Sequence, residues 1–140
     1  GAGYGDYDAH NGLWEMAVKT DHDVMVRMAL VPRVLEARGL DVTPGMIDKL
    51  EKVGVHELVN ILRVIHREEI GHVRIGTRWF NYICQLRGLS PRIIFSELLN
   101  DYMKGVIQGP FDQESRLQAG FTEDELQQLM EMSGEKETAV

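Results

Sequence analysis

The chain has 140 residues, with 15 Lys and Arg against 22 Asp and Glu, and a formal net charge of −7. This length fits one domain with a hydrophobic core, and the acidic balance argues against binding nucleic acid or an anionic membrane surface. Charged residues interrupt every apolar run well before the roughly 20 residues that a transmembrane helix needs. The single cysteine, Cys84, cannot form an internal disulfide, which favours a reducing compartment and predicts a cytoplasmic protein.

The first part of the chain predicts a loop and two helices. Residues 1–11 alternate Gly and Asp and are typical of a loop, and a short helix is expected over residues 12–19. The first residues resemble neither a translation start nor a signal peptide, so we expect either residues added for expression or a chain cut from a longer one. The segment 21–38 is rich in Met, Leu, Ala and Val and predicts a second helix, which Thr20 would cap. Pro32 lies inside this segment and predicts a kink or a break.

Glycine and proline separate the next helices. Gly39 is expected to end the second helix, because glycine is common just after a helix terminus. Thr43 and Pro44 are expected to begin a third helix, which stops at Gly54. The longest helix is predicted over residues 55–87.

Capping residues also mark the helices of the last third of the chain. Ser90 is the expected cap of one helix, Asp112 of a short one, and Thr122 opens a capping box for the last. No run alternates with a period of two for long enough to predict a strand, so the predicted fold class is all-α. Residues 1–132 are expected to form a single helical domain, and the polar segment 133–140 a flexible tail.

Two ionisable residues lie on the predicted buried face of the long helix. Arginines 63, 67, 74 and 78 form a solvated stripe on one side. Spacings of three and four residues place the following on the opposite face: Leu58, Leu62, Ile65, Glu69, His72, Gly76, Phe80 and Ile83. Burying a carboxylate is costly unless it is paired or binds a metal ion. The i, i+3 spacing places Glu69 and His72 on one side of the helix. They either bind a metal ion or form a buried hydrogen-bonded pair, or Glu69 pairs with an arginine from a neighbouring helix.

Glu36 is a candidate third ligand. It ends a stripe that it shares with Met25, Ala29 and Pro32 on one face of the second predicted helix. A carboxylate near a helix end is also commonly exposed to solvent, so Glu36 gains weight as a ligand only in combination with the motif in the long helix. Glu68 lies directly beside that motif.

With Glu36 on one helix and Glu69-x-x-His72 on the next, the sequence resembles half of a ferritin-like di-iron carboxylate site. Such a site takes a Glu from each of two helices and an E-x-x-H motif from each of two others. More specifically, the chain resembles the C-terminal half of a bacterial ferritin-like family of unassigned function, from about residue 4 to residue 130. Three stretches carry the resemblance: LVPRVLEARGLDVTPGM (residues 30–46), REEIGHVRIGTRWF (67–80) and GPFDQESRLQAGF (109–121).

The resemblance implies a ferritin-like half-bundle in which Glu36, Glu69 and His72 are metal ligands. Glu69 would be the bridging carboxylate, and Glu68 would support a ligand or replace one. The chain has one E-x-x-H motif where the family pattern has two. The resemblance therefore implies a homodimer that shares a di-iron or di-manganese site, with oxidoreductase chemistry on O2 or peroxide. Two alternatives remain open: one loosely held metal ion in a single copy, or a metal-free interaction module or inactive fragment with a buried Glu–His pair.

Overall fold

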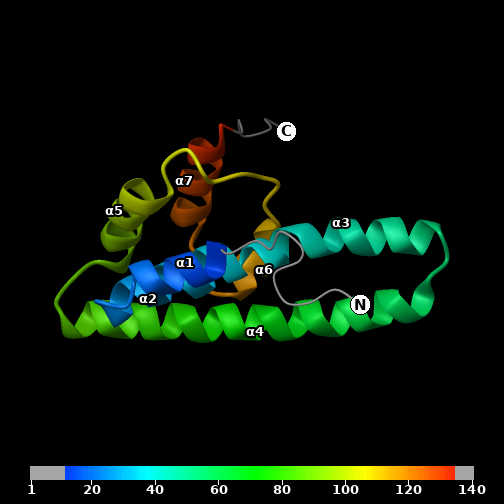
Figure 1. Ribbon diagram of the computed structural model, residues 1–140, viewed down its shortest axis with the longest axis horizontal. Helices are drawn as coiled ribbons and strands as arrows, with labels where there is room; N and C mark the ends of the chain where they lie inside the picture. Colours follow the sequence, from blue (N-terminus) through cyan, green and yellow to red (C-terminus); the bar gives the residue numbers. More distant parts are fainter. Residues whose placement is uncertain (1–11, 135–140) are drawn as a thin grey trace, which may run out of the picture.

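The computed structural model describes residues 12–134, and these residues form helices and no strand (Figure 1). The prediction of an all-α fold is confirmed. The helices are α1 (Gly12–Lys19), α2 (Val24–Leu30), the π-helix η1 (Val31–Glu36), α3 (Arg38–Lys52), α4 (His56–Leu86), α5 (Pro91–Met103), α6 (Gln113–Gln118) and α7 (Glu123–Ser133). The predicted loop over residues 1–11 and the predicted tail from residue 135 onward lie outside the described residues. None of the helices described is long and apolar enough to cross a membrane.

The long helix α4 is the element on which the others are arranged (Figure 1). Helices α2, η1, α3, α5 and α6 all contact it. Its predicted bounds are confirmed to within a residue, and it lies antiparallel to α3 in a helical hairpin. The turn of this hairpin contains Gly54, whose φ of +80° lies in the left-handed region that favours glycine. Gly88, with a φ of +68°, follows the end of α4 in the same way.

The second predicted helix is interrupted at Pro32, as expected. Helix α2 ends at Leu30, and the chain continues as the π-helix η1, which contains this proline. Proline has no amide hydrogen and disturbs the regular helical hydrogen bonds. Gly76 of α4 lies directly against the proline ring: a Cβ at this glycine would lie 2.4 Å from Pro32 Cγ. The absence of a side chain at Gly76 therefore sets how closely η1, and Glu36 at its end, approach α4.

Thr20 does not cap α2, so this prediction is wrong. Its hydroxyl donates to the carbonyl of Met16 at 2.7 Å, and this bond closes the end of α1. Asp23 is the cap, because its carboxylate accepts from the amide of Met25 at 2.8 Å. Both residue types are good helix caps, and the sequence spacing does not show which of the two caps α2.

The predicted break between Gly39 and Pro44 is also wrong. Helix α3 begins at Arg38 and passes through both residues. Within a helix, proline leaves the carbonyl four residues earlier without its donor, and here that carbonyl belongs to Leu40. The imidazole Nε2 of His66 in α4 lies 3.4 Å from this oxygen. The neighbouring helix thus supplies a polar group where the backbone of α3 lacks one.

Two of the three later caps agree with the sequence. Ser90 accepts from the amide of Ile93 at 3.5 Å, at the start of α5. Thr122 and Glu125 form a reciprocal capping box at the start of α7. Asp112 occupies the N-cap position of α6, but its side chain accepts no capping bond from that helix.

Two arginines lie in the hydrophobic core, and the sequence patterns did not predict either. Arg33 is 1% exposed and donates to both carboxylate oxygens of Glu125, at 2.8 and 2.9 Å, and to Thr77 Oγ1 at 3.1 Å. Arg116 donates to both carboxylate oxygens of Asp41, at 2.8 and 2.6 Å. The Arg33 guanidinium also lies 4.4–5.4 Å from the ring centroids of Phe80, Phe95 and Phe121. These buried pairs tie α7 to η1 and α6 to α3.

Candidate metal half-site

The structure brings Glu36, Glu69 and His72 into one neighbourhood. Glu36 is the last residue of η1, and the other two occupy successive turns of α4, against which η1 packs. Burial raises the pKa of Glu36, the Glu69 carboxylate raises it further, and His72 opposes the rise. The three residues are therefore close enough to act on one another electrostatically, although they come from two elements.

Glu69 has an unsatisfied oxygen. Its Oε2 lies 3.6 Å from His72 Nδ1, which is longer than a hydrogen bond. Its other oxygen, Oε1, is buried and has no hydrogen-bond partner. A buried acceptor without a donor costs about 1–3 kcal/mol, and more when the group is charged. A bound cation would remove this cost, so the local geometry fits a metal ligand.

The set of donor atoms also fits the predicted metals. Carboxylates and imidazole are ligands that suit iron and manganese. The only thiol, on Cys84, is fully buried in the core, and burial raises its pKa. This burial agrees with a packing role for Cys84 and leaves Glu36, Glu69 and His72 as an oxygen and nitrogen donor set.

His72 does not lie in the core of this chain, contrary to the prediction. Its side chain is 64% exposed, and that of Glu69 is 27% exposed. Leu58 and Ile65, predicted on the same buried face, are exposed as well. The face of α4 that packs against the other helices is turned slightly away from the predicted one and contains Val59, Ile70, Val73, Gly76, Thr77, Phe80 and Cys84. The candidate ligands therefore lie at the margin of the core, where the site opens to the surface.

A single copy of the described chain does not form a complete coordination shell. Over residues 12–134, no three His, Cys, Asp or Glu side chains are placed closely enough to hold a metal ion together. Glu68, the predicted supporting or alternate ligand, is exposed on the outer side of α4. Glu36, Glu69 and His72 therefore lie near one another at the margin of the core without forming a metal site within the described chain.

A second polar cluster lies where α6 packs against α4. His66 Nε2 lies 3.1 Å from Ser115 Oγ, and this hydroxyl is also bonded to Asp112. The same ring nitrogen lies 3.9 Å from the Asp112 carboxylate. In a nucleophile relay, the hydroxyl and the acid contact different nitrogens of the histidine, and Ser115 is buried. This cluster therefore joins α6 to α4 and has the geometry of a structural contact.

Comparison with known proteins identifies relatives of the chain. The model of a family described as "Protein of unknown function (DUF455)" matches residues 1–127. An uncharacterized protein of Haemophilus influenzae is 50% identical over 129 residues, which are 92% of this chain and 45% of the relative. The chain thus spans less than half the length of this relative. No solved structure matches the chain. Because the family model covers nearly the whole sequence, the chain belongs to the DUF455 family.

Proposed function

We propose that the chain is a ferritin-like metal-binding protein that carries half of a di-iron or di-manganese site. Glu36, Glu69 and His72 are the residues that would hold the metal ions. The observation that carries the proposal is the buried Glu69 Oε1 without a hydrogen-bond partner, because a buried carboxylate oxygen needs a donor or a cation. A second copy of the chain would bring the matching half, so that two chains together supply the four carboxylates and two imidazoles of such sites.

Each ligand has a separate structural support. Glu69 and His72 are held at adjacent positions by the regular geometry of α4. Glu36 is held by the contact between Pro32 and Gly76, which presses η1 against α4. A bound metal pair would supply redox chemistry toward O2 or peroxide, and Glu68 on the outer side of the same helix is available as a supporting carboxylate.

A metal-free interaction module is the second candidate function. It is favoured by the many exposed apolar side chains of α4, Ile75 and Trp79 among them. In this case Glu69 and His72 form only a polar pair at the edge of the core, and neither residue contributes to metal content.

Elemental analysis of protein loaded with Fe(II) or Mn(II) without oxygen distinguishes the two functions. Wild-type protein should retain about one metal ion per chain, and Glu69→Gln and His72→Ala should lose it. Glu57→Gln and His56→Ala are matched controls, because they change the same residue types at exposed positions of the first turn of α4. A wild-type content below about one tenth of an equivalent, or equal contents in site and control variants, would overturn the proposal.

A further inference from the structure

Helix α4 bears an exposed seam of apolar residues along nearly its whole length. We call it the α4 seam: positions 58, 61, 65, 68, 72, 75, 79, 82 and 86, which are separated alternately by three and four residues. All nine side chains are exposed in the described structure. Seven of them are large and apolar, with exposed fractions of 41–68%: Leu58, Ile61, Ile65, Ile75, Trp79, Tyr82 and Leu86. This alternation is the pattern of the contacting positions in paired helices.

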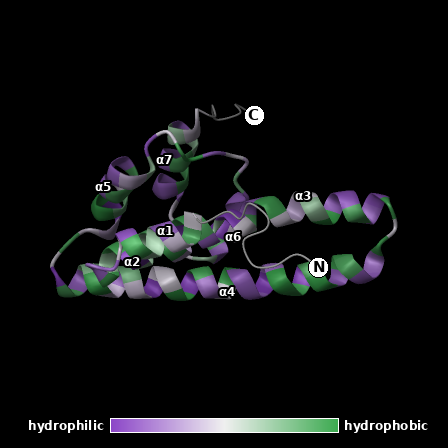
Figure 2. Ribbon diagram, viewed as in Figure 1, coloured by the Kyte–Doolittle hydropathy of each residue, from purple (hydrophilic) through white to green (hydrophobic). Residues whose placement is uncertain are grey.

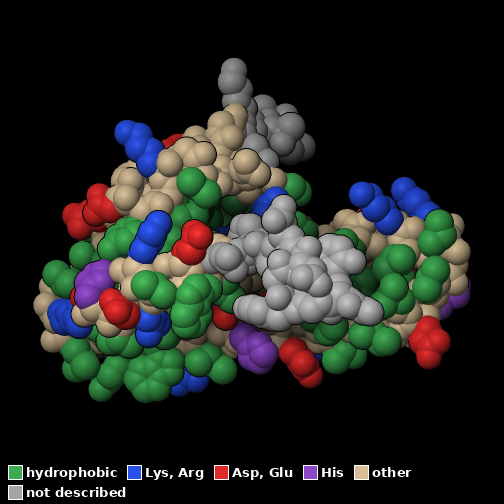
Figure 3. Space-filling model, in the orientation of Figure 1, with side chains coloured by type: hydrophobic (Ala, Val, Ile, Leu, Met, Phe, Trp, Pro, Cys, Tyr) green, Lys and Arg blue, Asp and Glu red, His purple; other side chains and the backbone are tan. Residues whose placement is uncertain are grey.

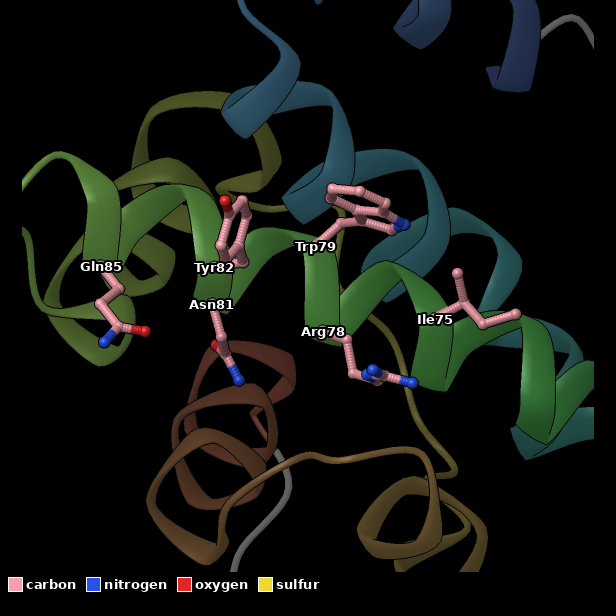
Figure 4. A pocket seen from close by; sticks show the side chains of 6 residues that line it. All are labelled: Ile75, Arg78, Trp79, Asn81, Tyr82 and Gln85. Carbon is pink, nitrogen blue, oxygen red and sulfur yellow. The ribbon is translucent and has the colours of Figure 1, made fainter.

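The α4 seam is too long and too apolar to be an ordinary surface. It extends for about 42 Å at the rise of an α-helix, and monomeric proteins rarely expose contiguous apolar patches above a few hundred Å². Figure 2 shows hydrophobic residues recurring from one end of α4 to the other, and Figure 3 shows hydrophobic side chains along the edge of the molecule that α4 forms. In Figure 4, Ile75, Trp79 and Tyr82 project from one side of the helix, and Arg78, Asn81 and Gln85 from another. The Trp79 and Tyr82 rings pack edge to face, with their centroids 5.9 Å apart.

The seam is symmetric about His72. Leu58 and Leu86 lie fourteen residues before and after it, and Ile65 and Trp79 lie seven residues before and after it. Across a two-fold axis, residue i of one copy contacts residue j of the other, and j contacts i, so an axis near His72 pairs the two ends of the seam with each other. A second copy, antiparallel and related by an axis near His72, places Leu58, Ile61 and Ile65 opposite Leu86, Tyr82 and Trp79. Ile75 is the one apolar residue of the seam that faces a polar one, Glu68.

The sizes of the side chains favour the antiparallel over the parallel orientation. In an antiparallel pair, Ile65 of one copy faces Trp79 of the other, and Ile61 faces Tyr82, so that these two layers each combine a smaller and a larger side chain. In a parallel pair, tryptophan would face tryptophan and tyrosine would face tyrosine near one end of the seam. Near the other end, isoleucine would face isoleucine, and the contact would contain only smaller side chains. Cores pack best when large and small residues face each other, and antiparallel helices also oppose their dipoles favourably.

The two polar positions of the seam lie at its centre. Glu68 and His72 interrupt an otherwise apolar run, at the point where the proposed axis crosses α4. The same axis brings the Glu69 carboxylate of each copy close to the other copy. Polar groups at the centre of a helix pair reduce its stability but fix its register, and a metal ion bound between them would remove their cost of burial.

We propose that a second copy of this chain docks antiparallel on the α4 seam, with a two-fold axis near His72, and so completes the metal site. The proposed docking surface depends only on the α4 seam, whereas the completion of the metal site rests on the proposed function. Each copy then contributes the same ligands from opposite sides of the axis, and docking covers the open face of the half-site.

Sedimentation velocity at micromolar concentrations tests the surface. Wild-type protein should be a dimer, and Ile65→Lys and Trp79→Lys should each raise its dissociation constant more than about tenfold. Val106→Lys is the matched control, because Val106 is equally exposed but lies outside α4. A monomeric wild-type protein, or a dimer that all three variants leave unchanged, would overturn docking on the seam. A monomer that instead binds the part of the longer relative that this chain does not span would also overturn it.

Disulfide cross-linking tests the orientation. The double variant Ile65→Cys/Trp79→Cys should form covalent dimers on mild oxidation, whereas each single variant should not. In the antiparallel pair, two copies of residue 65 are separated by about 21 Å along the axis, far beyond the reach of a disulfide. Cross-linking of the single variants as rapid as that of the double variant would indicate a parallel pair and overturn the proposed register.

Metal content separates this proposal from the proposed function. A cross-linked, metal-free dimer that binds neither Fe(II) nor Mn(II) would support docking and overturn the metal site. A monomeric seam variant that retains the full metal content would support the metal site and overturn its completion by a second copy. Loss of metal in Trp79→Lys, together with loss of the dimer, is the result expected if both proposals hold, because this residue is not a proposed ligand.

Discussion

The contact between η1 and α4 depends on the missing side chain of Gly76. A Cβ at this position would lie 2.4 Å from Cγ and 2.5 Å from Cβ of Pro32, whereas ordinary contacts begin at 3.4 Å. The substitution Gly76→Ala therefore forces the two helices apart by about 1 Å, because a proline ring cannot rotate away. Gly71, five residues earlier in the same helix, has no atom within 4 Å of the position that a Cβ would occupy. Gly71→Ala is thus a matched control for the change in backbone preference.

The magnitude follows from comparing the two variants. Replacing glycine by alanine inside a helix stabilises it by about 0.8–1.0 kcal/mol, and this gain applies to both positions. Forcing an extra methyl group into a packed contact costs about 1–3 kcal/mol, and this cost applies only to Gly76. We expect Gly76→Ala to be less stable than Gly71→Ala by about 1–3 kcal/mol, and Gly71→Ala to be at least as stable as wild type.

Urea unfolding followed by circular dichroism at a fixed protein concentration measures this difference. The fixed concentration matters because a dimer adds a concentration-dependent term to the free energy of unfolding. Equal stabilities of the two alanine variants, with unchanged dependence on urea, would refute the close packing of Pro32 on Gly76. If the packing also positions Glu36, Gly76→Ala should bind metal more weakly than Gly71→Ala.

Two further predictions concern ion pairs. Arg33→Met should lower the free energy of unfolding by about 3–5 kcal/mol, because it leaves the buried Glu125 carboxylate unpaired. The double variant Arg33→Met/Glu125→Gln should recover part of this loss. An equal loss in the single and the double variant would contradict this reasoning. The hydrogen bond from Arg87, with smaller contributions from the Met25 amide and from the charge of Arg87, lowers the pKa of Asp23 despite partial burial. A lowered carboxyl pKa stabilises the fold above the pKa of the unfolded chain, and this stabilisation is lost as the pH falls through the folded pKa. Asp23→Asn keeps a capping side chain and should be less stable than wild type at pH 7, and the difference should begin to shrink as the pH falls below about 4. Asp23→Ala should lose about 1 kcal/mol more with the cap. Differences in thermal unfolding that do not depend on pH would contradict the ion pair.

Most helix ends could be predicted from the sequence because their causes are local. Gly54 and Gly88 adopt positive φ values at the two ends of α4, and Thr122 caps α7 with its own neighbours. The predictions failed where a distant group supplied what the local sequence lacked. Proline at position 44 indicates a helix start by local rules, but α3 continues through it, and the carbonyl it leaves free lies beside His66, which is 26 residues away from Leu40.

The candidate ligands were proposed from the sequence, whereas their surroundings depend on the fold. The E-x-x-H spacing and the apolar stripe that ends at Glu36 are visible in the sequence, and Glu36 lies close enough to Glu69 and His72 for their charges to affect its pKa. Their burial was predicted too strongly, because a helix with apolar residues on two faces does not show which face its own chain covers. The burial of Arg33, in contrast, was not predicted, because it depends on three aromatic rings and Glu125, which are all distant in sequence.

The helical class and most helix boundaries follow from the amino-acid sequence alone, because periodicity and capping act over a few neighbouring positions. The covered face of α4, in contrast, depends on how the whole chain folds. Val73 and Phe80 lie in the core, whereas Ile75 and Trp79 are exposed, although both sets recur at helical spacing. The reason is that burial is a property of the elements that pack against a helix, and helices η1, α2 and α3 reach only one side of α4.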